Sequence, residues 1–124
     1  MIRPGQENIA GVLPGVLRAL GAGGESALEF PSARRACVVM VDGLGYRNLD
    51  QRRGHTPTLR SLDMRAITTV VPSTTAAGIC ALGTGALPGR TAMGGYALRV
   101  PGSTDVFNLI AWNSPHVDPV ERQT

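Results

Sequence analysis

The chain has 124 residues, of which 43% are hydrophobic and 17% charged, and its formal net charge is +3. This length suffices for one modest domain, and the hydrophobic content excludes a largely disordered chain. The basic residues are scattered arginines and aromatic residues make up only 4% of the chain, so we expect no nucleic-acid-binding surface.

The amino-terminal segment is predicted to be a helix rather than a targeting signal. Apolar residues at helical spacing indicate a helix over residues 8–20, with Asn8 as N-cap and Gly21 at its end. Pro14 leaves two short turns open as the alternative. Because glycine and proline interrupt the apolar residues, we expect no signal peptide, no membrane span and a cytoplasmic location.

Two buried strands are predicted in the middle of the chain. Residues 36–41 form a continuous apolar run, which is typical of a strand buried on both faces. Residues 64–71 are rich in β-branched side chains and predict the next strand. The remaining segments are expected to form a loop over 21–35, a short helix over 43–50, a polar loop over 52–58 and one helical turn over 58–62.

The second half is predicted to contain a helix and a hairpin. Small apolar residues over 74–84 suit a helix packed closely against a sheet, and the glycine-rich residues 83–95 are expected to form a loop. Residues 96–100 and 105–111 are strand candidates joined by a turn over 101–104, which predicts a hairpin. This order of helices and strands indicates the α/β fold class.

The first candidate site residue is Asp42, which follows the predicted strand 36–41 directly. A carboxylate at the carboxyl end of a buried strand faces the crevice where α/β sheets carry their sites. Gly43 allows a ligand to approach the backbone closely, and a divalent metal needs such an anionic oxygen. The alternative is that Asp42 caps a helix over residues 44–50.

The second candidate is Thr75, with Ser73 and Thr74 beside it, at the start of the predicted helix 74–84. A hydroxyl there lies at the positive end of the helix dipole, where free N–H groups can hold a phosphoryl oxygen. A metal bound to its oxygen would assist the formation of a threonine alkoxide. The alternative is a structural role, because Ser73 or Thr74 would cap this helix well.

Other motifs carry less chemistry. The glycine-rich loop that begins at Gly83 lacks the Gly-Lys-Ser/Thr ending of a phosphate loop and follows a helix rather than a strand. His55 and His116 are isolated and are expected to be surface residues. Cys37 and Cys80 lie in apolar runs away from any metal-binding spacing, and are expected to be small buried side chains.

Four motifs taken together resemble a known family. V-V-M-V-D-G-L-G, T-P-T-L, T-T-V-V-P-S-T-T-A and L-G-T-G-A-L-P-G-R are similar to the alkaline phosphatase superfamily, and within it to the nucleotide pyrophosphatase/phosphodiesterase branch. The similarity runs from about residue 8 to the end of the chain. The pairing of D-G after a strand with P-S/T-x-T at a helix start is the specific part.

The resemblance implies a doubly wound, mainly parallel α/β sheet, a pair of zinc ions and a small-molecule phosphoester substrate. It places Asp42 at a metal-ligand position and Thr75 at the position of the nucleophile, which also ligates that metal. Thr74 is the second choice for the nucleophile. The hydroxyl is phosphorylated during turnover in such enzymes.

The chain also departs from the family pattern. Ala76-Ala77-Gly78 follow the nucleophile position where phosphodiesterases often carry Pro-Asn, and Gly95-Tyr96 occupy the region of an asparagine that helps to hold the phosphoryl oxygen. A monoester and a diester therefore both remain open as substrates. The residues that could add metal ligands after Thr75 are Asp105, His116, Asp118 and Glu121.

Asp42 and Thr75 alone provide too few ligands for a two-metal site. We therefore expect residues 1–124 to be a single incomplete domain, the amino-terminal portion of a metal-dependent phosphoester hydrolase, that is inactive by itself. Its uncovered apolar segments, 36–41 and 66–71, predict a tendency to self-associate. The alternatives are a non-catalytic α/β binding module, which metal titration would distinguish, and a phosphomutase of the same superfamily.

Overall fold

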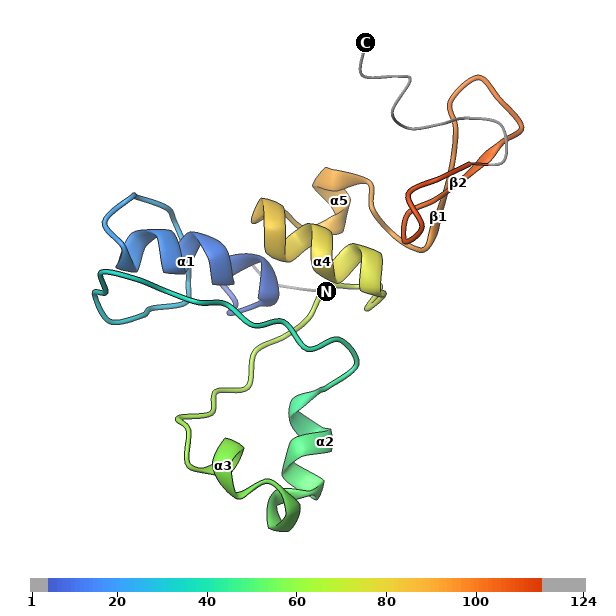
Figure 1. The fold of residues 1–124 in the computed structure, drawn as a ribbon. Helices are drawn as coiled ribbons and strands as arrows, with labels where there is room; N and C mark the ends of the chain where they lie inside the picture. Colours follow the sequence, from blue (N-terminus) through green and yellow to red (C-terminus); the bar gives the residue numbers. More distant parts are fainter. Residues whose placement is uncertain (1–4, 115–124) are drawn as a thin grey trace.

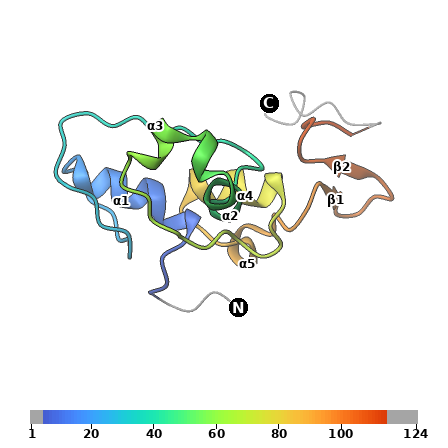
Figure 2. The same ribbon diagram turned by 90° about the horizontal axis from the view of Figure 1, so that it is seen from below.

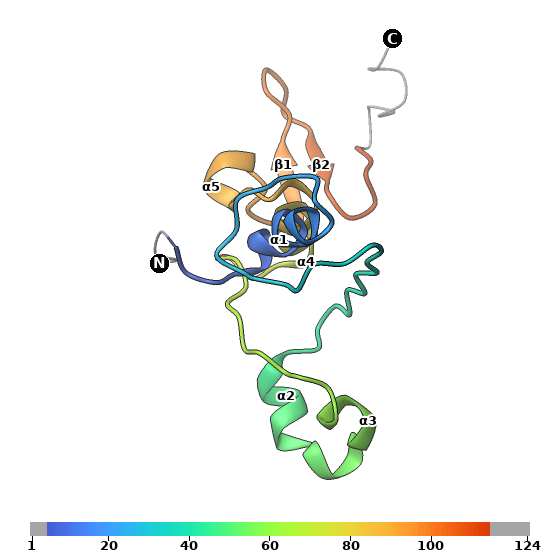
Figure 3. The same cartoon turned by 90° about the vertical axis from the view of Figure 1, so that its left-hand side faces the viewer.

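The computed structural model describes residues 5–114, which form short helices and one small sheet. Helices α1 and α4 lie side by side at the centre, and α5 lies next to α4 (Figure 1). The helices α2 and α3 extend to one side of this centre and the hairpin to another, as Figures 1 and 3 show. The 3₁₀ helices are η1 (Ile9–Gly11) and η2 (Arg53–His55), the α-helices are α1 (Val12–Ala19), α2 (Tyr46–Gln51), α3 (Pro57–Arg60), α4 (Thr75–Thr84) and α5 (Pro88–Thr91), and the strands are β1 (Ala97–Arg99) and β2 (Val106–Asn108).

The first helical segment confirms the predicted caps. The side chain of Asn8 accepts a hydrogen bond of 2.9 Å from the backbone N–H of Ala10 at the start of η1. Pro14 does not break the segment, because it lies in the first turn of α1, where a backbone N–H has no intrahelical acceptor. Gly21, with a φ of 78°, follows the helix end in a left-handed conformation that glycine adopts without strain.

The two predicted strands are extended but are not paired as a sheet. The backbone groups of residues 36–41 make no hydrogen bond to other residues among 5–114. Residues 64–71 contribute one isolated parallel bridge between Asn8 and Thr68, in which Ile9 N–H donates to Thr68 O at 2.9 Å. The described residues therefore form no parallel sheet, because these strands have apolar faces but lack neighbouring backbone with which to pair.

The hairpin forms as predicted, although both of its strands are shorter. Strands β1 and β2 are antiparallel, with Leu98 opposite Phe107, and the chain turns between them over residues 101–105. The second strand ends at Asn108 rather than at residue 111. The Asn108 side chain accepts hydrogen bonds from the N–H groups of Ile110 and Ala111, which turns the backbone out of the strand.

Helix α4 is bounded by strong local signals. Thr74 is its N-cap and accepts a hydrogen bond of 3.4 Å from Ala77 N–H, and Gly85 ends it with a φ of 69°. The following segment, predicted as a loop over 83–95, contains the single-turn helix α5 with Pro88 at its first position. The predicted helix over 43–50 begins later, at Tyr46, with Gly45 as its N-cap.

The buried core lies between η1, α4 and the extended segment before it. Val70, Ala77 and Ala81 are at most 1% exposed, and Val70 is the largest fully buried side chain among the described residues. Gly15 lets α1 approach the following loop, because a Cβ there would lie 2.8 Å from both Leu28 O and the Phe30 ring. This core is small, and many apolar side chains remain exposed, Val39 at 78% and Val71 at 71% among them.

Candidate active site

The structure brings Asp42 and Thr75 into direct contact. The Thr75 hydroxyl donates a hydrogen bond of 2.8 Å to Asp42 Oδ2, although 33 positions separate the two residues. Thr75 is the first residue of α4, and Asp42 ends the extended segment 36–41. The other carboxylate oxygen, Oδ1, accepts from Gly43 N–H at 3.0 Å. Each oxygen of this carboxylate thus has a donor that orients it.

Neither Asp42 nor Thr75 caps a helix with its side chain. Asp42 does not cap α2, because Gly45 is the N-cap of that helix and no side chain bonds to its first turn. At α4 the capping hydroxyl is that of Thr74. This division leaves the Thr75 hydroxyl available to Asp42, and it leaves Ser73 exposed at the same site.

A third side chain at the site, Tyr96, was not selected from the sequence. Its hydroxyl lies 3.4 Å from Thr75 Oγ1, and the residue immediately precedes β1. Its one sequence signal was its place in the region where the family resemblance expects an asparagine. The contact depends on how the chain after α5 returns toward α4, which no local pattern in the sequence specifies.

Asp42, Thr74 and Thr75 line a cavity of about 350 Å³ between the extended segment and the start of α4, whereas Tyr96 does not line it. At its helix end, the N–H groups of Thr75 and Ala76 have no acceptor among residues 5–114. The cavity therefore combines a carboxylate, hydroxyls and free backbone donors at a helix amino terminus. The lining residues are Ile9, Met40, Val41, Asp42, Gly43, Leu44, Gly45, Asn48, Thr69, Ser73, Thr74, Thr75 and Gly78.

The donor atoms present fit only part of a metal site. Asp42 and Thr75 provide adjacent oxygen atoms of the type that zinc and harder divalent cations bind. Within residues 5–114, however, no three His, Cys, Asp or Glu side chains come together as a metal-binding group. The pair could supply two ligands of a cation, and the other ligands would have to come from residues outside this group.

The other residues considered from the sequence lie away from this site. His55 is exposed in η2, and His116, Asp118 and Glu121 lie outside the described residues. The prediction that both cysteines are buried is wrong: Cys37 is exposed, because the segment around it has no neighbouring strand among the described residues, and Cys80 is only half-buried.

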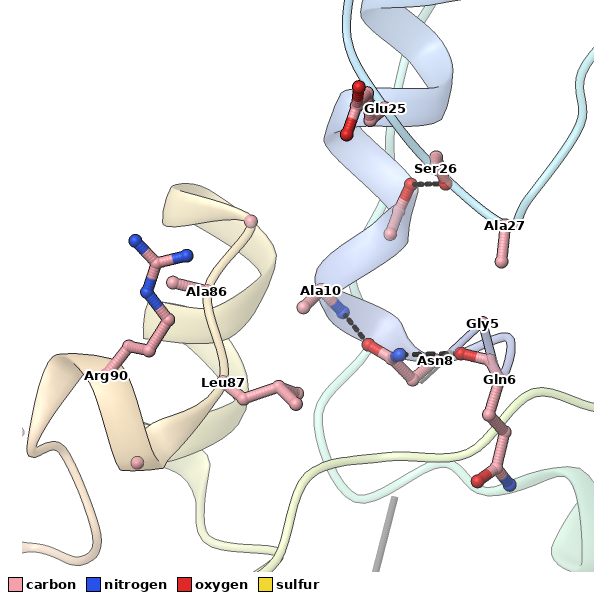
Figure 4. A pocket seen from close by; sticks show the side chains of 13 residues that line it. Gly5, Gln6, Asn8, Ala10, Glu25, Ser26, Ala27, Ala86, Leu87 and Arg90 are labelled. Atoms are coloured by element: carbon pink, nitrogen blue, oxygen red, sulfur yellow. Dashed lines mark hydrogen bonds between the residues drawn. The ribbon is translucent and has the colours of Figure 1, made fainter. Parts of the chain in front are cut away.

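A larger cavity of about 740 Å³ lies on another side of α4 and contains none of the candidate catalytic residues (Figure 4). Its polar groups are mostly engaged in local structure: Asn8 bonds to Ala10 N–H and Gln6 O, and the Ser26 hydroxyl donates to Gly11 O. Its wide opening and engaged polar groups suit a packing surface better than a catalytic centre. The view from below shows α5 beside α4 (Figure 2).

Comparison with known proteins identifies the class. The model of the type I phosphodiesterase / nucleotide pyrophosphatase family matches residues 36–118, well over half of the chain. The chain therefore belongs to this family, which confirms the resemblance found in the motifs. Comparisons with curated proteins and with solved structures gave no match. No helix within residues 5–114 is long and apolar enough to cross a membrane.

Proposed function

We propose that the chain is part of a phosphoester hydrolase, which its family membership supports. We propose that Thr75 is the nucleophile of this hydrolase and that Asp42 is a ligand of its metal. The observation that carries the proposal is the 2.8 Å hydrogen bond between Thr75 Oγ1 and Asp42 Oδ2 at the start of α4. Thr75 is favoured over Thr74, whose hydroxyl is engaged as the helix cap.

The proposed reaction is a displacement at phosphorus. Thr75 Oγ attacks the phosphorus atom of a small phosphoester and loses its proton, and the bond from phosphorus to the leaving alcohol breaks. The alcohol oxygen takes up a proton, and water later hydrolyses the phosphorylated threonine. The free N–H groups of Thr75 and Ala76 stabilise the negative charge that develops on the phosphoryl oxygens.

Two further groups shape the site. The Tyr96 hydroxyl, 3.4 Å from Thr75 Oγ1, would donate to a phosphoryl oxygen of the substrate. A zinc ion or another divalent cation held by Asp42 and Thr75 would polarise the phosphoryl group and favour ionisation of the hydroxyl.

We further propose that residues 1–124 are the amino-terminal portion of a larger domain. Within residues 5–114, two oxygen ligands are too few for a two-metal site, and the extended segments 36–41 and 64–71 have no neighbouring strands that would complete a doubly wound sheet. The remaining ligands and strands would then be supplied by additional polypeptide. The genomic sequence after codon 124 tests this, since in-frame Asp and His motifs are expected there.

The site itself is tested by calorimetric zinc titration of the 124-residue chain. We expect weak binding that Asp42→Asn abolishes and Thr75→Val weakens, because each removes one of the two donors. Asp63→Asn and Thr104→Val are matched controls, since both residues are exposed and make no contact with the site. Equal zinc binding by Asp42→Asn and by the unaltered chain would contradict the assignment of Asp42.

The nucleophile is tested in the longer protein, if the reading frame continues. There we expect Thr75→Ala to reduce hydrolysis of bis(4-nitrophenyl) phosphate by at least about a thousandfold, as for loss of other nucleophiles. Thr74→Ala should retain most activity, and Tyr96→Phe should lower kcat more than it raises KM. A Thr75→Ala enzyme with near-normal kcat would eliminate Thr75 as the nucleophile.

A further inference from the structure

The cavity beside Asp42 and Thr75 also reaches the helix α2. Asn48, in the first turn of α2, is the one residue of that helix that lines the cavity. The extended segment 36–41 leads into α2 (Figure 1), so Asn48 lies beyond the carboxyl end of that segment. Ligands of α/β proteins bind at this end of the strands, which stays open when further strands pair along their sides. We therefore expect the cavity to remain when additional polypeptide completes the sheet.

The side-chain amide of Asn48 is free to bind a ligand. It makes no hydrogen bond to any group among residues 5–114, and it does not cap α2, whose N-cap Gly45 has no side-chain hydrogen bond. A Cβ on Gly45 would lie 3.2 Å from Asn48 Oδ1, so the amide lies where a side chain at position 45 would disturb it. Such an amide accepts hydrogen bonds through its oxygen and donates them through its nitrogen.

Two hydroxyl groups of the same cavity are also free. The side chains of Thr69 and Ser73 are exposed and make no hydrogen bond among the described residues. By contrast, Thr74 caps α4, and Asp42 and Thr75 bond to each other. The side chains at the reacting oxygen are thus engaged within the protein, whereas neutral polar groups elsewhere in the cavity remain available.

The rest of the cavity favours a small and neutral ligand group. Ile9, Met40 and Leu44 supply apolar side chains, and Asp42 is the one charged residue among the described residues that line the cavity. An anionic group away from the phosphorus atom would meet this carboxylate without a cationic side chain to balance it. The volume of about 350 Å³ is near the lower end for ligand pockets.

We propose that Asn48 is a specificity-determining residue that binds the alcohol portion of the substrate. The substrate class is a phosphoester of a small neutral alcohol with further hydroxyl groups, which exchange hydrogen bonds with the Asn48 amide and the Ser73 hydroxyl. An alcohol without these hydroxyls covers the amide but leaves it unpaired, which costs affinity. The proposal rests on the proposed function of Thr75, which places the phosphoryl group at the start of α4.

Binding of phosphate compounds to the 124-residue chain, followed by ¹⁵N NMR, tests this role. The probes are glycerol 3-phosphate, propyl phosphate, which has the same carbon skeleton without the free hydroxyls, and inorganic phosphate. Magnesium is the added cation, because zinc phosphate precipitates. We expect glycerol 3-phosphate to bind about 2- to 10-fold more tightly than propyl phosphate and to shift the side-chain NH₂ signals of Asn48.

Asn48→Ala should remove this preference and leave the affinity for inorganic phosphate unchanged. Asn113→Ala is the matched control, because Asn113 is an exposed asparagine that does not line the cavity, and it should keep the preference. Asn48→Gln retains an amide and should keep part of it. Circular dichroism of each variant, compared with the unaltered chain, checks that the fold is retained.

Two results would overturn the role of Asn48: equal binding of glycerol 3-phosphate and propyl phosphate, or a preference that Asn48→Ala leaves intact. Inorganic phosphate separates this failure from failure of the proposed function. If it shifts the backbone N–H signals of Thr75 and Ala76, the phosphoryl site stands and only the role of Asn48 is lost. If it shifts neither signal, both proposals fail.

Discussion

At the scale of single residues, Thr74 and Thr75 are adjacent threonines with different contacts. Thr74 Oγ1 accepts from Ala77 N–H as the cap of α4, whereas Thr75 Oγ1 bonds to Asp42. A cap acts on helix stability, while an exposed side-chain pair contributes little to it. Removal of the Thr74 hydroxyl should therefore lower the stability more than removal of the Thr75 hydroxyl.

We predict that Thr74→Ala lowers the free energy of unfolding by about 1 kcal/mol, and that Thr75→Ala changes it by less than about 0.5 kcal/mol. Urea unfolding followed by circular dichroism at low protein concentration measures both values. Thr74→Ser is the control, because serine keeps the capping oxygen and should stay close to the unaltered chain. A larger loss from Thr75→Ala than from Thr74→Ala would reverse the two roles.

The sequence allowed Asp42 and Thr75 to be selected because each follows an apolar run at the same relative position. The two side chains are in contact, as two ligands of one metal would be, but they do not lie at the ends of neighbouring parallel strands, because residues 5–114 form no parallel sheet. The sequence could not decide whether Asp42 caps a helix, because that depends on where α2 begins. Tyr96 was missed as a site residue, since its contact with Thr75 arises from the path of the chain after α5.

At the scale of elements, α1 depends on the absence of a side chain at Gly15. A Cβ there would lie 2.8 Å from Leu28 O and from the Phe30 ring, closer than real contacts allow. Gly83 offers a comparison within a helix, because a Cβ there meets nothing within 4 Å.

We predict that Gly15→Ala lowers the free energy of unfolding by about 1–3 kcal/mol, because the loop over 28–30 must move away from α1. Gly83→Ala is the matched control and should raise it by about 0.4–1 kcal/mol, since alanine favours the helix. Urea unfolding of the two variants in parallel gives the comparison. Gly15→Ala as stable as Gly83→Ala would show that α1 does not need this close approach.

The elements that could be predicted are those whose signals are local. The first helical segment has Asn8 and Gly21 at its ends, α4 has Thr74 and Gly85, and the hairpin has its own turn. Local signals could not predict whether the segments 36–41 and 64–71 pair as strands. Their apolar composition is local, but a strand also needs a partner backbone, and the described residues provide only the bridge at Thr68.

At the scale of the whole molecule, the candidate site is incomplete within the described residues. Asp42 and Thr75 offer two oxygen donors, and no cluster of three ligating side chains accompanies them between residues 5 and 114. We predict that the purified 124-residue chain does not hydrolyse bis(4-nitrophenyl) phosphate above the buffer rate when zinc is present. Turnover that a chelator abolishes and that Thr75→Ala removes would show that the chain completes its own site.

The described residues also have a small core compared with the apolar surface that they expose. Val70 is the largest fully buried side chain among the described residues, whereas Val39, Val41 and Val71 are each more than half exposed. We expect a chain with so little buried apolar area to be marginally stable alone and to gain stability when a second copy covers part of that surface.

We therefore predict that its thermal unfolding is broad and that Tm rises with protein concentration, because a dimer that dissociates on unfolding is favoured by mass action. Calorimetry over a hundredfold concentration range, with size-exclusion chromatography at each end, measures both properties. A sharp transition at one Tm, from a monomer at every concentration, would show that the chain is stable without a partner strand and would remove the basis for regarding it as part of a larger domain.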